Sequence, residues 1–183
     1  MGIKLTELII VDIEATCWER GSKPREEPNE IIEIGLCIFN LKEWKAEKKD
    51  QIIVTPTQST VSKYCTNLTG WTKKQLVDSG VLLGDACSKL TSVYNTRSRT
   101  WASWGNYDRL QFERECRWKA IPYPFSADHI NLKTIFAIHQ GITNSVGMSK
   151  ALPMLGLKLE GRHHNGADDA WNIGRILESM GRV

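Results

Sequence analysis

Residues 8–14 read Leu8-Ile9-Ile10-Val11-Asp12-Ile13-Glu14, an apolar run that two acidic residues close. The run predicts a buried strand over Glu7–Asp12. Side chains two residues apart on a strand point to the same face, so we expect the carboxylates of Asp12 and Glu14 to converge. Buried ionised carboxylates need a partner charge or a metal ion, and Mg²⁺ and Mn²⁺ prefer oxygen ligands. The stretch therefore predicts half of a metal site, with an acidic strand end in contact with water as the alternative.

Size and composition favour one globular domain over residues 1–183. The chain has 183 residues, of which 41% are hydrophobic and 25% charged, enough for a sizeable core. Its net charge of +3 arises from interspersed residues of both signs, which permits a polyanionic partner without requiring one. The sequence has no run of about 18 apolar residues, so we expect no membrane span. The segment Met1–Leu5 lacks the apolar region of a secretion signal, so we expect no secretion.

The cysteines do not indicate a disulfide-rich or zinc-ribbon protein. Their number is odd and no Cys-x-x-Cys pair occurs, so neither a disulfide framework nor a zinc ribbon is expected. We expect reduced thiols and a cytoplasmic protein, with the nucleus as the alternative in a eukaryotic host. The five cysteines are Cys17, Cys37, Cys65, Cys87 and Cys116.

Further along the chain, the hydrophobic pattern predicts mainly strands first and helices later. We expect strands over Ile31–Phe39, Gln51–Val54 and Thr100–Trp104, with a charged turn over Asn40–Asp50 and a short strand near Ile130–Leu132. The expected helices are a short one opened by a capping box at Thr72 to Gln75, then Leu82–Tyr94, Leu110–Lys119, one ending near Gln140, Met148–Leu155 and Asp168–Met180. This order predicts an α/β fold with a mixed central sheet flanked by helices. Ligand sites in such folds lie outside the carboxyl ends of the strands.

Asp108 is the first candidate partner for the acidic pair. It follows the strand predicted at Thr100–Trp104 and precedes a helix, so its carboxylate would lie at the same edge of the sheet as Asp12. The alternative is a helix N-cap, which is the more common role for an aspartate at such a position. Asp128 is a weaker rival, because it follows a Pro-Tyr-Pro loop and precedes no periodic helix.

The segment Arg162–Ala170 supplies two histidines and two further acids. A histidine ahead of a helix that carries Asp169 suits a general base, because the pKa of imidazole lies near neutrality. The alternative is that Asp168 and Asp169 only stabilise the positive helix N-terminus. A zinc site is disfavoured, since adjacent histidines lack the usual ligand spacing and no cysteine pair accompanies them. Four separated carboxylates and one histidine match the requirements of two-metal phosphoryl transfer.

Five segments occur in the order found in a known family. They are Ile10–Cys17, Glu30–Gly35, Asn67–Thr72, Ser103–Asp108 and Gly161–Asn172. The chain resembles the DEDDh 3′–5′ exonuclease superfamily and looks closest to the enhanced-RNAi type exoribonucleases, which include the histone-mRNA 3′-exonuclease. The resemblance implies an RNase H-like fold.

The resemblance also implies roles for individual residues. It implies Asp12, Glu14, Asp108 and Asp169 as ligands of two divalent cations, Mg²⁺ or Mn²⁺, with Glu14 also taking part in catalysis. The family spacing of histidine and aspartate selects His164, not His163, as the general base. The residues that would hold the terminal nucleotide are Ala15, Thr16, Leu68 and Tyr107.

The implied activity is removal of 3′-terminal nucleotides from single-stranded or 3′-overhang RNA as 5′-monophosphates. A DNA exonuclease of the proofreading or repair kind is the alternative, because the same acids would serve it. An inactive nucleic-acid-binding module is disfavoured, because binding alone needs no such set of acids. Aromatic side chains often stack on single-stranded bases, and Trp18 and Trp71 lie next to the shared segments. The sequence predicts no particular protein partner.

Overall fold

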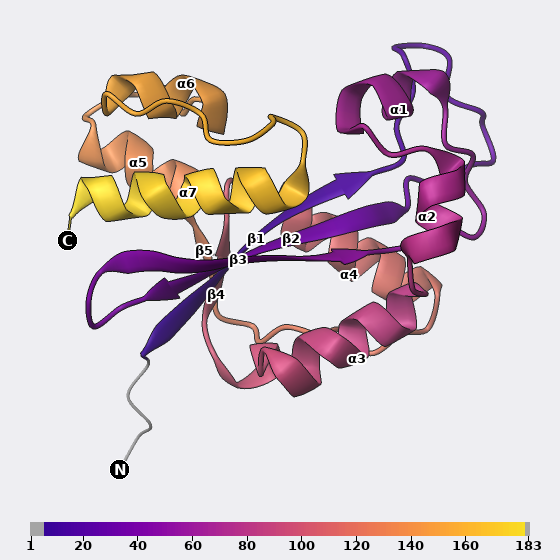
Figure 1. Cartoon of the computed structure of the whole chain (residues 1–183), viewed down its shortest axis with the longest axis horizontal. Helices are drawn as coiled ribbons and strands as arrows, with labels where there is room; N and C mark the ends of the chain where they lie inside the picture. Colours follow the sequence, from indigo (N-terminus) through magenta and orange to yellow (C-terminus); the bar gives the residue numbers. More distant parts are fainter. Residues whose placement is uncertain (1–5, 182–183) are drawn as a thin grey trace.

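The computed structural model of the chain describes residues 6–181 and is built around a five-stranded sheet (Figure 1). The strands lie in the order β3-β2-β1-β4-β5. The central strand β1 (Glu7–Ala15) pairs antiparallel with β2 (Ile31–Asn40), and β2 pairs antiparallel with β3 (Lys45–Ile53). On its other side β1 runs parallel to β4 (Trp101–Ser103), which runs parallel to β5 (His129–Asn131). The predicted α/β fold with a mixed sheet is confirmed.

Helices cover both faces of this sheet. Their bounds are α1 (Lys63–Thr69), α2 (Lys73–Ser79), α3 (Leu83–Val93), α4 (Tyr107–Trp118), α5 (Leu132–His139), α6 (Met148–Met154) and α7 (Gly166–Met180), with a 3₁₀ turn at Thr96–Ser98. Figure 1 shows α5, α6 and α7 over one face, and α3 and α4 over the other. Among the described residues, no helix is both long and apolar enough to cross a bilayer. The segment Met1–Leu5, where we predict no secretion signal, lies outside the described residues.

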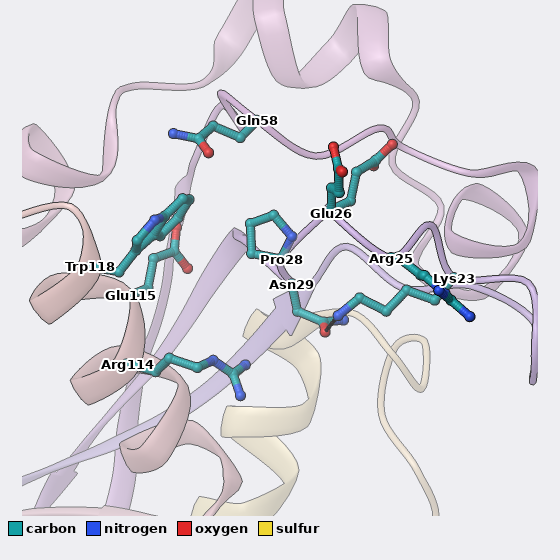
Figure 2. A pocket seen from close by; sticks show the side chains of 10 residues that line it. Lys23, Arg25, Glu26, Pro28, Asn29, Gln58, Arg114, Glu115 and Trp118 are labelled. Atoms are coloured by element: carbon teal, nitrogen blue, oxygen red, sulfur yellow. Dashed lines mark hydrogen bonds between the residues drawn. The ribbon is translucent and has the colours of Figure 1, made fainter.

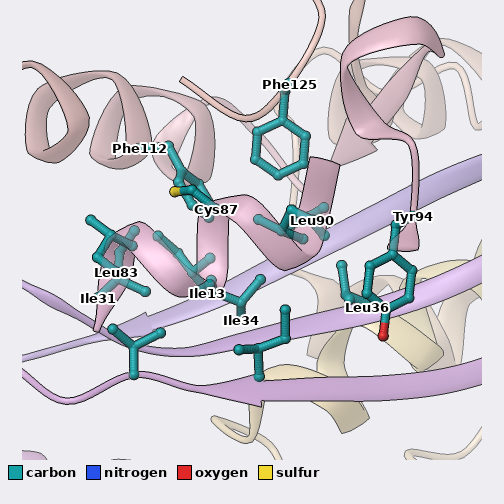
Figure 3. Packing of buried hydrophobic residues seen from close by; sticks show 14 of the residues in the cluster. Ile13, Ile31, Ile34, Leu36, Leu83, Cys87, Leu90, Tyr94, Phe112 and Phe125 are labelled. Carbon is teal, nitrogen blue, oxygen red and sulfur yellow. The ribbon is translucent and has the colours of Figure 1, made fainter. Parts of the chain in front are cut away.

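Alternation along β1 determines where its acids point. Ile9, Val11 and Ile13 belong to the core beneath α3 and α4, and Figure 3 shows Ile13 in this packing. Leu8 and Ile10 belong to the opposite core, beneath α7.

Asp12 and Glu14 continue the face of β1 that Leu8 and Ile10 begin, because side chains two residues apart share a face. They are therefore directed toward α7. Ile13 faces the other way, as predicted.

Two strand predictions need correction. β1 does not end at Asp12 but runs on to Ala15, because β2 pairs with it throughout. The charged turn predicted over Asn40–Asp50 is wrong, because most of it belongs to β3. β3 is an edge strand that buries Ala46 and exposes its lysines, and charged edge strands of this kind discourage pairing with other chains. Its polar composition hid its true length.

The helix predictions are more accurate for the longer helices than for the short ones. The helix predicted over Leu82–Tyr94 is α3, and the capping box of α2 forms as predicted between Thr72 and Gln75. Helix α1 was not predicted, because its seven residues are too few to show a clear period. It begins after Ser62, whose hydroxyl accepts a hydrogen bond from a backbone N–H, and ends at Gly70 in a left-handed conformation (φ 85°).

Candidate active site

Asp108 fills a gap beside the central strand. β4 pairs with β1 only at Ile9 and Ile10, so the backbone of β1 beyond them has no strand on that side. Asp108 lies in the first turn of α4, and its Oδ1 accepts a hydrogen bond of 3.0 Å from the backbone N–H of Ile13. The N-cap of α4 is Asn106, so the capping alternative for Asp108 is wrong. Asp108 is buried against the acidic end of β1 instead.

Asp169 reaches the same place from α7, because two glycines let that helix approach the sheet closely. A Cβ atom on Gly35 of β2 would lie 1.9 Å from the backbone of Gly166. A Cβ atom on Gly166 would in turn lie 3.0 Å from the carbonyl oxygen of Asp12. The carboxylates of Asp12, Glu14 and Asp169 consequently offer oxygen atoms within 4.8 Å of one another. The predicted convergence is therefore observed in the structure.

The acids of this cluster repel one another in a buried setting. Burial, followed by the charges of Asp108, Asp169 and Glu14, raises the pKa of Asp12 well above its usual value. Burial and the charge of Asp169 raise the pKa of Glu14 to about 8. Burial raises the pKa of Asp108 to about 6, although hydrogen bonds from Ile13 and Ser103 oppose the change. The ion pairs that Glu14 and Asp169 make are to histidines.

One oxygen atom of the cluster is open to a metal ion. Asp169 Oδ1 is buried and has no hydrogen-bond partner within residues 6–181. A buried acceptor without a partner is costly, and a divalent cation with oxygen ligands would satisfy it. The donor set is made of carboxylates, which suits Mg²⁺ or Mn²⁺. The residues present therefore fit a divalent metal.

The two histidines lie over this cluster on the loop before α7. The backbone N–H of His164 donates to Asp169 Oδ2 at 2.9 Å, and His163 Nδ1 lies 2.9 Å from the same oxygen. His164 Nδ1 lies 4.0 Å from Glu14 Oε1, and its backbone is left-handed (φ 64°). Burial, followed by the charges of His163 and Arg162, lowers the pKa of His164. A neutral imidazole beside the acids can accept a proton.

Arg162 and Asp168 hold the histidine loop in place. The guanidinium of Arg162 donates to the carbonyl oxygens of Asn67 (3.1 Å) and Leu68 (2.9 Å) in α1. The backbone N–H of Arg162 donates to Asp168 at 2.8 Å, and Asp168 also pairs with Lys49 of β3. The only role that the sequence offered for Asp168 was to stabilise the helix N-terminus, and the structure shows that it also anchors the loop.

The four residues expected to hold a nucleotide differ in exposure. Tyr107 is exposed at the start of α4, and Leu68 is half-buried at the end of α1. Ala15 is buried, and the hydroxyl of the fully buried Thr16 accepts a hydrogen bond from the backbone N–H of Glu30. The Thr16 side chain is thus committed to the protein. Asp128, the rival acid, is exposed in the loop before β5.

Glu33 is a further buried acid, to which the sequence assigned no catalytic role. Its carboxylate accepts hydrogen bonds from the indole of Trp71 (2.6 Å) and from the backbone N–H of Ala167 (3.1 Å). Ala167 lies in the first turn of α7, two residues before Asp169. Glu33 therefore anchors the helix that carries Asp169. No local signal could reveal this, because its partners are 38 and 134 residues away.

A pocket of about 510 Å³ opens between α4 and the loop before β2 (Figure 2). Lys23, Arg25 and Arg114 line it together with Glu26, Glu27 and Glu115, so its charges balance and do not favour an anion. Directly after α4, the C-cap residue Lys119 is already paired, because its ammonium group lies 2.6 Å from Glu30 and 2.9 Å from Glu115.

Comparison with known proteins of the same fold identifies the class of protein to which this site belongs. The nuclease domain of 3′hExo, a DEDDh family member solved with rAMP bound, superposes with a TM-score of 0.84 and 27% identity, covering 96% of this chain and 91% of that one. The fold is that of the RNase H-like exonucleases. The chain belongs to the exonuclease family, whose model matches residues 9–177. The expected class, a 3′–5′ exonuclease, is confirmed.

Two relatives extend this finding. The 3′-5′ exonuclease Snipper of Drosophila melanogaster is 31% identical over 96% of this chain and 69% of its own length. ERI1 exoribonuclease 2 of Xenopus laevis is 28% identical over 94% of this chain. The chain spans only 28% of the length of the Xenopus protein. The predicted similarity to enhanced-RNAi type exoribonucleases is therefore confirmed.

Proposed function

We propose that residues 1–183 act as one exonuclease domain that shortens RNA from a single-stranded or overhanging 3′ end and releases 5′-monophosphates. The convergence of Asp12, Glu14 and Asp169 carries this proposal, because such a cluster suits metal-assisted hydrolysis of a phosphodiester. Relatives named as exoribonucleases and a neighbour with bound rAMP support RNA as the substrate. The free cysteines suit a reducing compartment, so we place the reaction in the cytoplasm, or in the nucleus of a eukaryotic host.

Exonucleases of this family depend on divalent metal ions. We assign Asp12, Glu14, Asp108 and Asp169 as ligands of two such ions, Mg²⁺ or Mn²⁺. When bound, the ions would acidify the attacking water and neutralise charge that develops on the phosphate oxygens. The unpartnered Asp169 Oδ1 and the raised pKa of each acid support this assignment.

We assign His164 as the general base that takes a proton from the attacking water. Its imidazole has a lowered pKa and lies beside the acids, whereas the His163 imidazole is held at Asp169. Glu14 lies 4.0 Å from His164 Nδ1, so its carboxylate would stabilise the imidazolium that forms. This gives Glu14 a catalytic role besides metal binding.

The terminal nucleotide would lie between α1 and α4. We assign Leu68 and Tyr107 to its base and sugar, because both side chains are at least partly exposed. They also lie on helices that contact the end of β1, α1 through Cys65 and Ala15 and α4 through Asp108 and Ile13. Ala15 and Thr16 would contribute through their backbone, since the Thr16 hydroxyl is already bonded within the protein.

A degradation assay on matched RNA and DNA oligonucleotides with 5′ labels tests the proposal. We expect shortening from the 3′ end in Mg²⁺ or Mn²⁺, none in EDTA, and faster loss of RNA because only RNA offers a 2′-hydroxyl. His164→Ala should reduce the rate, whereas His139→Ala, at an exposed histidine of α5, serves as the control. Full activity in EDTA, or of Asp12→Asn in Mg²⁺, would contradict the proposal.

A further inference from the structure

His163 and His164 form a second group of potential metal ligands at the edge of the acid cluster. One nitrogen atom of each imidazole and one oxygen atom of Asp169 lie within 4.8 Å of one another. The two rings stack with centroids 4.0 Å apart and an angle of 21° between their planes. Glu14, 4.0 Å from His164 Nδ1, is within reach as a fourth ligand.

We propose that His163, His164 and Asp169 bind a late first-row divalent ion such as Zn²⁺, and that this ion inhibits the enzyme. Two imidazoles and one or two carboxylates make a donor set typical of zinc, which prefers four ligands in tetrahedral geometry. Imidazole ligands favour zinc over Mg²⁺, and zinc binds such sites more tightly than Mn²⁺. The sequence argued against zinc because the histidines are adjacent, but the fold supplies the further ligands from α7 and β1.

One imidazole must turn out of the stack before both rings can direct a nitrogen atom at the same ion. Atoms that share a tetrahedral zinc ion lie about 3.3 Å apart, given bonds of about 2.0 Å to nitrogen and oxygen. The side chains of His163 and His164 are 38% and 41% exposed, which leaves room for this turn. The ion would replace the contact that His163 Nδ1 makes with Asp169 Oδ2. Asp169 Oδ1 has no hydrogen-bond partner among the described residues, so it is also available.

Zinc binding at this place does not depend on the proposed function. The inhibition does rest on it, because the zinc ion would share ligands with the catalytic site. A zinc ion at this place would occupy the imidazole nitrogen with which His164 accepts a proton. It would also take Asp169 from the catalytic cations. His163 is the residue that distinguishes this site from the catalytic one, because the catalytic assignment makes no use of it.

Zinc binding by the full chain, measured by competition with a chromophoric zinc chelator in excess Mg²⁺, tests the site directly. The informative variant is His163→Asn, because the asparagine amide can still donate to Asp169 but is a poor zinc ligand. We expect His163→Asn to weaken zinc affinity by on the order of 100-fold, since even residues behind the ligands change metal affinity 10- to 100-fold. His139→Ala should bind zinc as the wild type does. Zinc held by Cys17, the one partly exposed cysteine, would be unaffected by either change.

Equal zinc affinity of wild type and His163→Asn, or no zinc binding by the wild type, would overturn the proposal. A second measurement, RNA degradation in Mg²⁺ with increasing zinc, is read as the ratio of inhibited to uninhibited rate within each variant. We expect the wild type to be inhibited and His163→Asn to resist. Equal inhibition of the wild type and His163→Asn by zinc would contradict the inhibitory role of this site. Failure of the proposed nuclease function would instead appear as no degradation without zinc, and would leave the binding result intact.

Discussion

Glu14 and Glu30 are both buried glutamates near the same end of neighbouring strands, yet their surroundings are opposite. Glu30 is fully buried and accepts hydrogen bonds from three backbone N–H groups and from Lys119. Burial alone would raise its pKa, but these donors lower it to about 2. Glu14 is 8% exposed and faces other acids, and its pKa rises to about 8.

This difference separates two uses of a buried acid. The Glu30 carboxylate is neutralised by the protein and joins α4 to the loop around Thr57, so we interpret it as structural. The Glu14 carboxylate is left for a ligand from outside, so we interpret it as functional. Both residues are buried glutamates, so their neighbours decide whether the pKa rises or falls.

The largest effect should come from Asp12→Asn. We expect the rate of RNA degradation to fall by about 1,000-fold, because metal-assisted charge stabilisation is worth several kcal/mol in the transition state. At pH 8 without metal, the same change should raise the melting temperature, since it removes one of several repelling acids. Initial rates and thermal unfolding in EDTA measure the two effects. A lower melting temperature would mean that the acids do not repel one another.

Glu30→Ala should give the reverse pattern. We expect the free energy of unfolding to fall by about 3–5 kcal/mol, because Lys119 loses a partner in a buried network. Activity per folded molecule should stay within a few-fold of the wild type. Urea unfolding measures the loss, with Glu26→Ala on the same exposed loop as a control expected to change stability by less than about 0.5 kcal/mol. A similar loss of stability in Glu30→Ala and Glu26→Ala would contradict the structural role of Glu30.

Glu33→Ala tests the intermediate case, since Glu33 is bonded to the protein yet supports the site. We expect a loss of about 1–3 kcal/mol in stability, because the N–H groups of Trp71 and Ala167 lose their acceptor. Activity should fall as well, because the helix that carries Asp169 loses its anchor. Glu33→Gln keeps one acceptor oxygen and should restore part of both. Urea unfolding and initial rates report the outcome, and unchanged activity in Glu33→Ala would refute the anchoring role.

The last prediction concerns the pH dependence of stability. The folded, metal-free chain should keep a proton on Glu14 between pH 4.5 and about 8, where the unfolded chain releases it. Its contribution to stability is therefore full below about pH 4.5 and is lost as the pH rises toward 8. The difference in unfolding free energy between wild type and Glu14→Gln isolates this contribution. Saturating Mg²⁺ should abolish the pH dependence, and a difference that is flat in EDTA would contradict the raised pKa.

The sequence predicted the convergence of the acids better than the network of contacts that supports it. Asp12 and Glu14 could be found because a strand places residues two apart on one face, and the long helix α3 because its apolar period is clear. The convergence of Asp12, Glu14 and Asp169 is seen in the structure, but their roles in metal binding and catalysis remain proposals.

The parts that escaped prediction depend on distant partners. Glu33 bonds to a helix 134 residues later, and Lys119 pairs with an acid 89 residues earlier. The full length of β3 was missed because its charged residues face water on a sheet edge. Local patterns carry no information on such contacts.

A titration with Mn²⁺, followed by electron paramagnetic resonance of the free ion, tests the central claim most directly. The claim is that the carboxylates gathered at the end of β1 bind divalent cations. We predict saturable binding of two ions per wild-type chain, lost in Asp12→Asn and retained in Glu30→Gln. No saturable binding by the wild type, or equal binding by Asp12→Asn, would contradict the account.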